Sequence, residues 1–196
     1  LVDGRPRWEW RYLDNLFSRD RKWKVTSVMV GEEPLQRGPG EHEFPADRAS
    51  LFAYDLVVLG DLPFEAFRPD EGEWLRDFVG ERGGGLLLID GARGGLRSAA
   101  VGVLDALRPG DGLPGSAPLS PTALRVAAAA EGLPALDLGP ASAGAKSVWV
   151  ELPAPHQLVR LKPRTGAEVL LEAVLADGST APALLHRRFG AGQVLH

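Results

Sequence analysis

Residues 55–61 read Asp55-Leu56-Val57-Val58-Leu59-Gly60-Asp61, an unbroken apolar run closed at each end by an acid. Such a run is typical of a strand buried on both faces of a parallel sheet. Residues 86–89 repeat the pattern after three glycines and lead into the turn Asp90-Gly91. Between the two runs, residues 69–81 have the apolar spacing of a helix. This order of strand, helix and strand predicts parallel pairing through a right-handed crossover.

The same alternation begins earlier in the chain. Periodicity predicts the end of a strand at 1–4, a helix at 6–19, a strand at 24–30 and a short helix at 46–53. Beyond these units we predict helices at 99–107 and 122–131, a loop at 109–121, and extended segments at 147–151 and 157–162. Strands at 168–176 and 183–189, joined by a polar turn, predict a β-hairpin near the C-terminus, and a last strand at 192–195 returns against it.

The composition limits the classes of function. With 196 residues and 44% hydrophobic residues, the chain can form one sizeable domain, which we expect to span 1–196. A net charge of −4 argues against general nucleic-acid binding. The absence of cysteine excludes thiol nucleophiles, disulfides and cysteine metal sites. No apolar run approaches the ~20 residues that span a bilayer, and both ends of the sequence suggest a domain of a longer protein.

Three acids follow predicted strands and mark the candidate site. Asp3, Asp61 and Asp90 should share the edge at which open α/β sheets bind ligands. Such carboxylates could bind a metal or a sugar-like ligand, or they could be helix caps and turn formers. With Arg5 and with Arg93 in the turn after Asp90, they form a tentative ligand-binding set. No catalytic residue, metal ligand or cofactor is assigned.

Arginines near the first predicted helix offer a second possibility. Arg5, Arg7 and Arg11 could bind an anion together with the helix N-terminus. Alternatively, Arg7 and Arg11 lie on a solvated face and Asp3 caps the helix. On the same helix we expect Trp8 to lie in the core, as Trp74 does on its own helix. Trp10 would then point away from Trp8 and cover the sheet edge or a partner surface.

Other motifs for chemistry are weak. Ser98 is the nearest hydroxyl after the Asp90 turn, but the Gly-x-Ser-x-Gly spacing of a nucleophile elbow is absent. The glycine-rich stretches match neither the Walker pattern nor the Gly-x-Gly-x-x-Gly pattern of phosphate-binding loops. The four histidines include no pair at the i, i+4 spacing of a zinc site.

The opening Val-Asp-Gly-Arg-Pro-Arg-Trp-Glu-Trp-Arg-Tyr-Leu at 2–13 resembles the start of class I glutamine amidotransferase-like domains. These domains occur in large bacterial membrane-associated proteins, often with von Willebrand factor A modules. The resemblance continues at 44–45, 54–61, 74–79 leading into 83–85, and 190–195. It implies a flavodoxin-like three-layer sandwich with a mainly parallel sheet. True members use a cysteine nucleophile with a downstream His and Glu, so this chain lacks the means for glutamine hydrolysis by that route.

We therefore expect an α/β domain that is not an enzyme. The leading hypothesis is a non-catalytic ligand-binding or protein-interaction module of a larger bacterial protein. That protein would be membrane-anchored, with the domain outside the bilayer and the periplasmic side favoured. Its partners would be other domains of the same chain or other proteins, and self-association through an edge strand is a further possibility. The alternative is a hydrolase that uses the carboxylate edge or Ser98.

Overall fold

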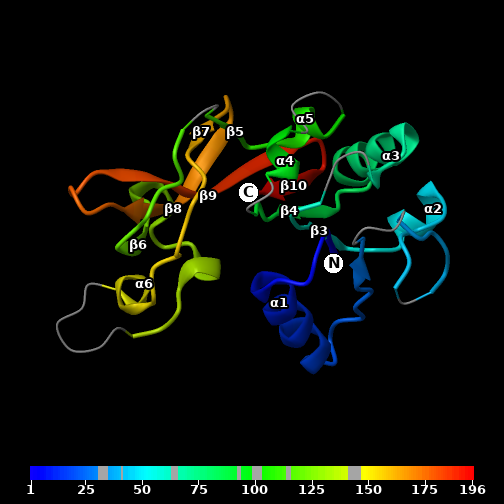
Figure 1. The fold of residues 1–196 in the computed structure, drawn as a ribbon, viewed down its shortest axis with the longest axis horizontal. Helices are drawn as coiled ribbons and strands as arrows, with labels where there is room; N and C mark the ends of the chain where they lie inside the picture. The colour runs from blue at the N-terminus through cyan, green and yellow to red at the C-terminus, as the bar shows by residue number, and fades with distance from the viewer. Residues whose placement is uncertain are drawn as a thin grey trace. The chain divides into compact units, whose positions relative to one another are not determined.

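The structure, a computed structural model, describes residues 1–30, 35–40, 42–62, 66–91, 94–98, 103–113, 116–140 and 147–196. The chain folds as two compact units (Figure 1). The first comprises Leu1–Leu107 and Arg188–Val194, and the second comprises Arg108–Arg187 and Leu195–His196. Each unit is described below by itself.

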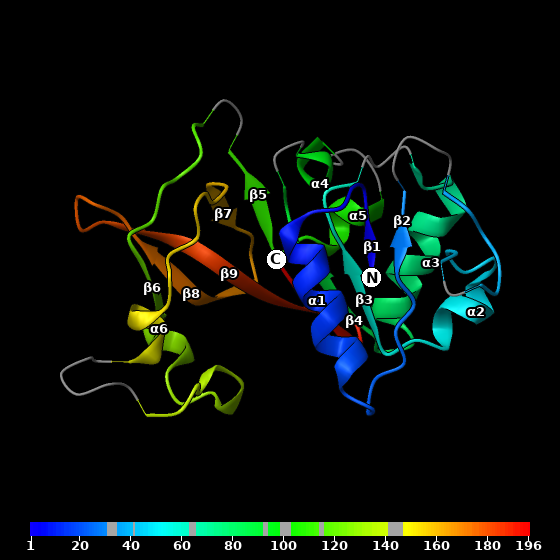
Figure 2. The ribbon, with the colours of Figure 1, turned by 60° about the horizontal axis from the view of Figure 1, so that its bottom comes forward.

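The first unit is built around parallel strands. Its elements are β1 (Val2–Asp3), α1 (Trp8–Arg19), β2 (Val28–Met29), α2 (Arg48–Phe52), β3 (Leu56–Leu59), α3 (Pro69–Gly80), β4 (Gly85–Leu88), α4 (Gly95–Ser98), α5 (Val103–Leu107) and β10 (Gly192–Leu195). The strands lie in the order β2-β1-β3-β4-β10, and the pairs β1–β2, β1–β3 and β3–β4 are parallel. Figure 2 shows α1 on one face of these strands, with α3 and α5 on the other.

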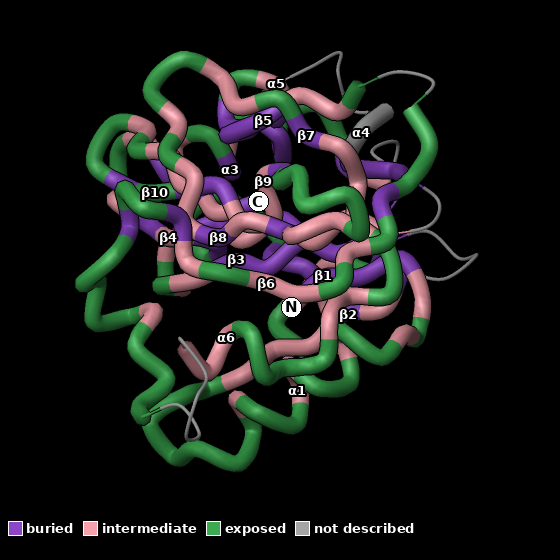
Figure 3. The backbone as a smooth tube through the Cα atoms, turned by 90° about the vertical axis from the view of Figure 1, so that its left-hand side faces the viewer, coloured by how far each residue is buried: buried purple, intermediate pink, exposed green. Residues whose placement is uncertain are grey.

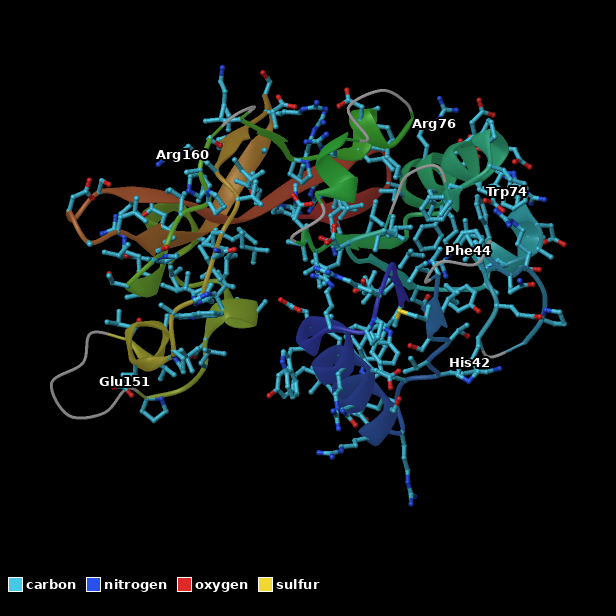
Figure 4. All side chains as sticks on the ribbon, viewed as in Figure 1. His42, Phe44, Trp74, Arg76, Glu151 and Arg160 are labelled. Atoms are coloured by element: carbon cyan, nitrogen blue, oxygen red, sulfur yellow. The ribbon has the colours of Figure 1, made fainter. Side chains whose placement is uncertain are left out.

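The core of the first unit lies where the apolar runs predicted it. Leu59, Leu86 and Val194 on the strands pack with Leu75 and Phe78 of α3, and all five are essentially inaccessible to solvent. In Figure 4, Trp74 and Phe44 belong to this same part of the molecule. Phe44 is buried, whereas Trp74 is half-buried against the core, as its helix position predicted. The burial map in Figure 3 colours much of β1 and β3 as buried, which agrees with their burial pattern.

The second unit is dominated by antiparallel pairing. It contains β5 (Gly110–Gly112), β6 (Ala123–Val126), the short 3-10 helices η2 (Ala128–Ala130) and η3 (Pro134–Leu136), α6 (Val148–Glu151), β7 (Leu161–Pro163), β8 (Ala167–Val174) and β9 (Thr180–Phe189). The strand β8 pairs antiparallel with both β6 and β9, and β5 pairs antiparallel with β7.

Predicted elements were confirmed best where apolar runs were longest. The parallel strands, α3 and the antiparallel pair β8–β9 were all anticipated. The turn between β8 and β9 requires the positive φ of 81° at Gly178. The return of the last strand is also confirmed, because Leu185 and His196 exchange both backbone hydrogen bonds at 2.8 and 2.9 Å. The α/β class therefore holds, with parallel strands in the first unit and antiparallel strands in the second.

Three local predictions were wrong. Residues 122–131 are not one helix, because 123–126 form β6 and pair with β8, so that only the alanines that follow form a helical turn. Residues 147–151 form the short helix α6 in place of a strand. Part of the loop predicted at 109–121 is strand β5. In each case pairing or packing within the second unit overrides the local propensity of a short segment.

No helix in the described parts of the chain is both long enough and apolar enough to cross a membrane.

Candidate functional site

The ends of three parallel strands come together at the predicted edge. Asp3 closes β1, Asp61 follows β3 by two residues, and Asp90 follows β4 by two. Backbone bonds from Gly60 to Val2 (2.7 Å) and from Ile89 to Leu59 (2.9 Å) extend the parallel register past the strand ends. The structure thus brings Asp3, Asp61 and Asp90 to one edge, as the strand pattern predicted.

The Asp3 carboxylate is taken up by a buried ion pair. Arg7 donates from Nε to Asp3 Oδ2 at 2.7 Å, and the two side chains are only 10% and 4% exposed. The same guanidinium donates to the backbone oxygens of Ile89 (2.8 Å) and Asp90 (3.0 Å). Arg7 therefore joins the end of β1 to the end of β4. This role was not predicted from the sequence, because Asp3 ends a strand and Arg7 precedes the helix, so no regular spacing relates the two residues.

Asp61 is also engaged internally. Its side chain is completely buried, and its Oδ1 accepts a hydrogen bond from the backbone N–H of Gly95 at 3.2 Å. Arg5 approaches the other oxygen, with Nη2 at 3.9 Å from Asp61 Oδ2, and its side chain is 39% exposed. The backbone N–H of Arg5 lies 3.4 Å from Asp3 Oδ1. The carboxylates thus hold the strand ends and the turn before α4.

Glycines let these strand ends approach closely. A Cβ at Gly60 would overlap the Asp3 carboxylate, one at Gly91 would overlap the Asp61 side chain, and one at Gly4 would overlap the Asp61 backbone oxygen. At Gly60 and Gly91, the space that an added methyl group would need is filled by the carboxylate side chains. The edge is consequently a packed joint with little room for a ligand between the acids.

Of the remaining predicted residues, only Asp90 has a side chain that the structure describes. Asp90 contributes its backbone oxygen to Arg7, and both oxygens of its carboxylate are buried. Arg93 lies outside the described residues, and Ser98 lies on α4 with its side chain outside them. Within the described ranges, no group of three or more His, Cys, Asp or Glu side chains is placed to hold a metal ion.

A small pocket lies beside the edge. Its lining includes Asp3, Arg7, Trp10, Leu13 and Ile89, and it has space for about one water molecule. Such a space is far below the 300–1,000 Å³ of small-molecule sites. It therefore offers no substrate site to the carboxylates.

The predicted anion site does not assemble. Arg7 immediately precedes α1 and is bound to Asp3, whereas Arg11 is exposed and its guanidinium carbon lies 5.7 Å from the centre of the Trp8 ring. The alternative interpretation was right for Arg11, which lies on a solvated face, and wrong for Arg7, which is largely buried.

The orientation predicted for the first helix was also wrong. Trp8 is 65% exposed, whereas Trp10 turns inward, lines the small pocket and donates from Nε1 to Ser27 Oγ at 3.0 Å. Tyr12 and Leu16 share the outer side with Trp8 and are 68% and 63% exposed. The helix α1 has no fully buried residue (Figure 3).

A second buried ion pair lies at the start of α3. Glu71 is completely buried and accepts from Arg37 Nη2 at 2.9 Å and from the backbone N–H of Arg68 at 2.8 Å. The hydrogen bond to Glu71 raises the pKa of the Arg37 guanidinium above its usual range. Because Glu71 also caps the helix, this pair has a structural role.

Comparisons with known proteins give a fold and no family. No family model and no curated protein matches the chain. Among solved structures, the cytoplasmic protein STM3548 from Salmonella typhimurium is similar, with a TM-score of 0.58 and 20% identity over 78% of this chain and 63% of its own. The cytoplasmic protein STM1381 from Salmonella typhimurium LT2 has a TM-score of 0.59 and 17% identity over 95% of this chain and 74% of its own.

A third similar structure is the exo-beta-1,4-mannosidase Op5Man5 from Opitutaceae bacterium strain TAV5, with a TM-score of 0.48 and 16% identity. The match covers 95% of this chain and 26% of the mannosidase. For STM3548, the matched 63% means that this chain spans less than two thirds of the length of that protein. At these identities the two Salmonella structures support the α/β fold.

Proposed function

We propose that this chain is a non-catalytic protein-interaction module, and that the outward face of α1 is its binding surface. The observation that carries the proposal is the contrast between two parts of the first unit. The carboxylates at the strand edge are buried and bound internally, whereas Trp8, Tyr12 and Leu16 on α1 are each more than 60% exposed.

The exposed side chains form one stripe, named here the α1 stripe (Trp8, Tyr12 and Leu16). They recur every four residues, so they lie on one side of the helix. The rings of Trp8 and Tyr12 are stacked with centres 5.9 Å apart. Tryptophan and tyrosine are the side chains most often found as binding anchors in protein interfaces. Contiguous apolar surface of this kind marks interaction sites in otherwise soluble folds.

The wider context of the module is also part of the proposal. The amidotransferase-like opening motif supports a flavodoxin-like three-layer arrangement and a place in a larger, membrane-anchored bacterial protein, with the periplasmic side favoured. Helices on both faces of the parallel strands are consistent with that arrangement (Figure 2). Because the chain has no cysteine, a member of this group with this sequence would keep the fold and lack the nucleophile.

A hydrolase has less support. A carboxylate that acts as acid or base must reach a substrate atom within hydrogen-bond distance. Asp3 and Asp61 are enclosed and engaged by Arg7 and by the Gly95 amide. A small ligand at the same edge has less support for the same reason, because the joint is packed.

Photocrosslinking tests the proposed surface. A photoreactive phenylalanine analogue is placed at Tyr12, or at the exposed Glu73 of α3 as a control, in cells that naturally express the full-length protein. We expect a discrete crosslinked partner from position 12 and none from position 73, with the product lost when Trp8→Ser is added. Equal labelling at both positions, or labelling that survives Trp8→Ser, would refute the proposal.

A further inference from the structure

The α1 stripe runs beside a second row of side chains with a different character. Arg11, Asn15 and Arg19 each lie three residues after a member of the stripe, so they form a neighbouring row on the same exposed side. Asn15 donates to the backbone oxygen of Arg11 at 2.8 Å. Within the described residues, neither Arg11 nor Arg19 forms an ion pair with a carboxylate. We name this the arginine row.

From this juxtaposition we propose that the partner is an acidic amphipathic peptide segment. It would place apolar side chains on the α1 stripe and carboxylates on the arginine row. The inference rests on the proposed function and adds the chemistry of the partner.

The local charge supports an acidic partner. Residues 5–24 contain seven basic and three acidic residues and so carry a net charge of +4, whereas the whole chain carries −4. After α1, Arg21, Lys22 and Lys24 are all exposed and extend the basic character beyond Arg19. A positive patch on an acidic protein selects partners of the opposite charge and speeds their association.

Arg11 is also held in a suitable position. Its guanidinium lies over the Trp8 ring at 5.7 Å, an arrangement favoured by the cation–π attraction. A guanidinium held in this way keeps N–H groups for a carboxylate and loses less conformational freedom on binding. The apolar anchor and the charge-recognition group are therefore one preassembled pair.

The size of the surface favours a short segment. A buried aromatic side chain contributes roughly 150–250 Å². At their exposures, Trp8, Tyr12 and Leu16 together offer roughly 300–450 Å². That area is below the ~800 Å² per partner of a standard protein interface. The area matches a helix of a few turns or a strand of a few residues, because the stripe is only about 12 Å long.

Two other occupants fit the surface less well. A second copy of this chain would bring one arginine row against another and would pay for like-charge repulsion. An anionic bilayer is the second such occupant, and the stripe is short for it. Helices that lie in bilayer interfaces usually present longer apolar faces than three side chains.

Selection of random displayed peptides, 16 residues long, tests the proposal. The library is selected on the whole chain and counter-selected on Tyr12→Ser, and the enriched peptides are sequenced and synthesised. We expect enriched peptides with a net negative charge and apolar residues at a spacing of three to four. Their affinity should fall about thirtyfold with Tyr12→Ser and about tenfold with the double variant Arg11→Glu, Arg19→Glu.

Arg188→Glu is the matched control for charge reversal. Arg188 is exposed on β9, away from α1 in sequence, and the substitution should leave peptide affinity unchanged. Lysine-for-glutamate versions of the selected peptides should bind the wild type poorly and regain affinity for the Arg11→Glu, Arg19→Glu variant. Circular dichroism checks that each variant is folded.

The outcomes separate the two levels of the proposal. Peptides that depend on Tyr12 but carry neutral or positive charge would overturn the acidic partner and leave the interaction surface standing. If no selected peptide depends on Tyr12, and neither vesicle binding nor a dimer does, both fail. Sedimentation with phosphatidylglycerol vesicles and light scattering accompany the selection. Vesicle binding or a dimer abolished by Tyr12→Ser, without selected peptides, would replace the peptide by a membrane or a second copy.

Discussion

Replacement of Arg7 by methionine should strongly destabilise the first unit. Methionine keeps much of the length and apolar volume of arginine but removes three hydrogen bonds, of 2.7, 2.8 and 3.0 Å. Asp3 would remain a buried carboxylate, 4% exposed, without its cation. Breaking a buried pair on one side costs about 3–5 kcal/mol. In a domain of this size each kcal/mol lowers the melting temperature by about 2–4 °C.

Denaturation by urea, followed by tryptophan fluorescence, measures this loss. Four of the five tryptophans lie in the first unit, so a Trp149→Phe background makes the signal report on that unit alone. Arg48→Met is the matched control, because Arg48 is 44% exposed in its pairs with Asp77 and Glu81. Exposed pairs of this kind contribute up to about 1 kcal/mol.

The double variant Asp3→Asn, Arg7→Met completes the test. If the buried charge causes the loss, removing it as well should recover part of the stability, so that the two substitutions are coupled. Should Arg7→Met lower the free energy of unfolding by no more than Arg48→Met does, the interpretation of the strand edge as a buried electrostatic joint is wrong.

Three further predictions follow from particular positions. Gly60→Ala should destabilise the first unit by about 1–3 kcal/mol, because its methyl group would overlap the Asp3 carboxylate; a neutral result in the same urea assay would contradict the packing. Trp8→Ser should change stability by less than about 0.5 kcal/mol, because the side chain is 65% exposed; a large loss in thermal denaturation would mean that Trp8 belongs to the core. The hydrogen bond from Arg164 lowers the pKa of Asp111 in the folded state. Asp111 therefore adds stability that is fully present above its unfolded pKa of about 3.9 and is lost as the pH falls through its lower folded pKa. Arg164→Met should thus cost up to about 1 kcal/mol at pH 7, since Asp111 is half-exposed, and progressively less below pH 4; a loss independent of pH in melting curves would exclude this origin.

The sequence was a good guide to the strands and a poor guide to the orientation of α1. The runs at 55–61 and 86–89 have one compatible environment, a strand buried on both faces, so their prediction depended on little else. The helix has apolar residues on two sides. Trp8, Tyr12 and Leu16 form one side, and Trp10, Leu13 and Phe17 form the other. Periodicity identifies such a helix but does not decide which side packs against the sheet.

The sequence predicted where the candidate site lies, but not whether its carboxylates are already bound by other groups of the protein. Parallel strand ends meet at one edge, so the convergence of Asp3, Asp61 and Asp90 follows from the strand pattern alone. Whether the carboxylates of Asp3 and Asp61 are free depends on contacts that the strand pattern does not encode, namely the position of the Arg7 side chain and the turn that presents the Gly95 amide. In the second unit, the alanines at 127–130 favoured a helix, but pairing with β8 fixed the preceding residues as a strand.

The buried joint and the exposed stripe are connected through α1. Arg7 immediately precedes the first residue of the helix, and its bonds to Asp3, Ile89 and Asp90 fix the start of α1 against the strand ends. Trp8 is the next residue and Tyr12 lies about one turn beyond it, so both are held in position by the fixed start of the helix. A surface held rigid before binding avoids part of the entropy that ordering would cost. In the proposed function, Asp3 at the strand edge therefore serves binding indirectly, because its bond to Arg7 helps to hold the helix that presents the stripe. Arg7→Met should then weaken peptide binding even without urea, when the protein is fully folded. Substitutions confined to the second unit, such as one at Gly178, should leave peptide binding unchanged.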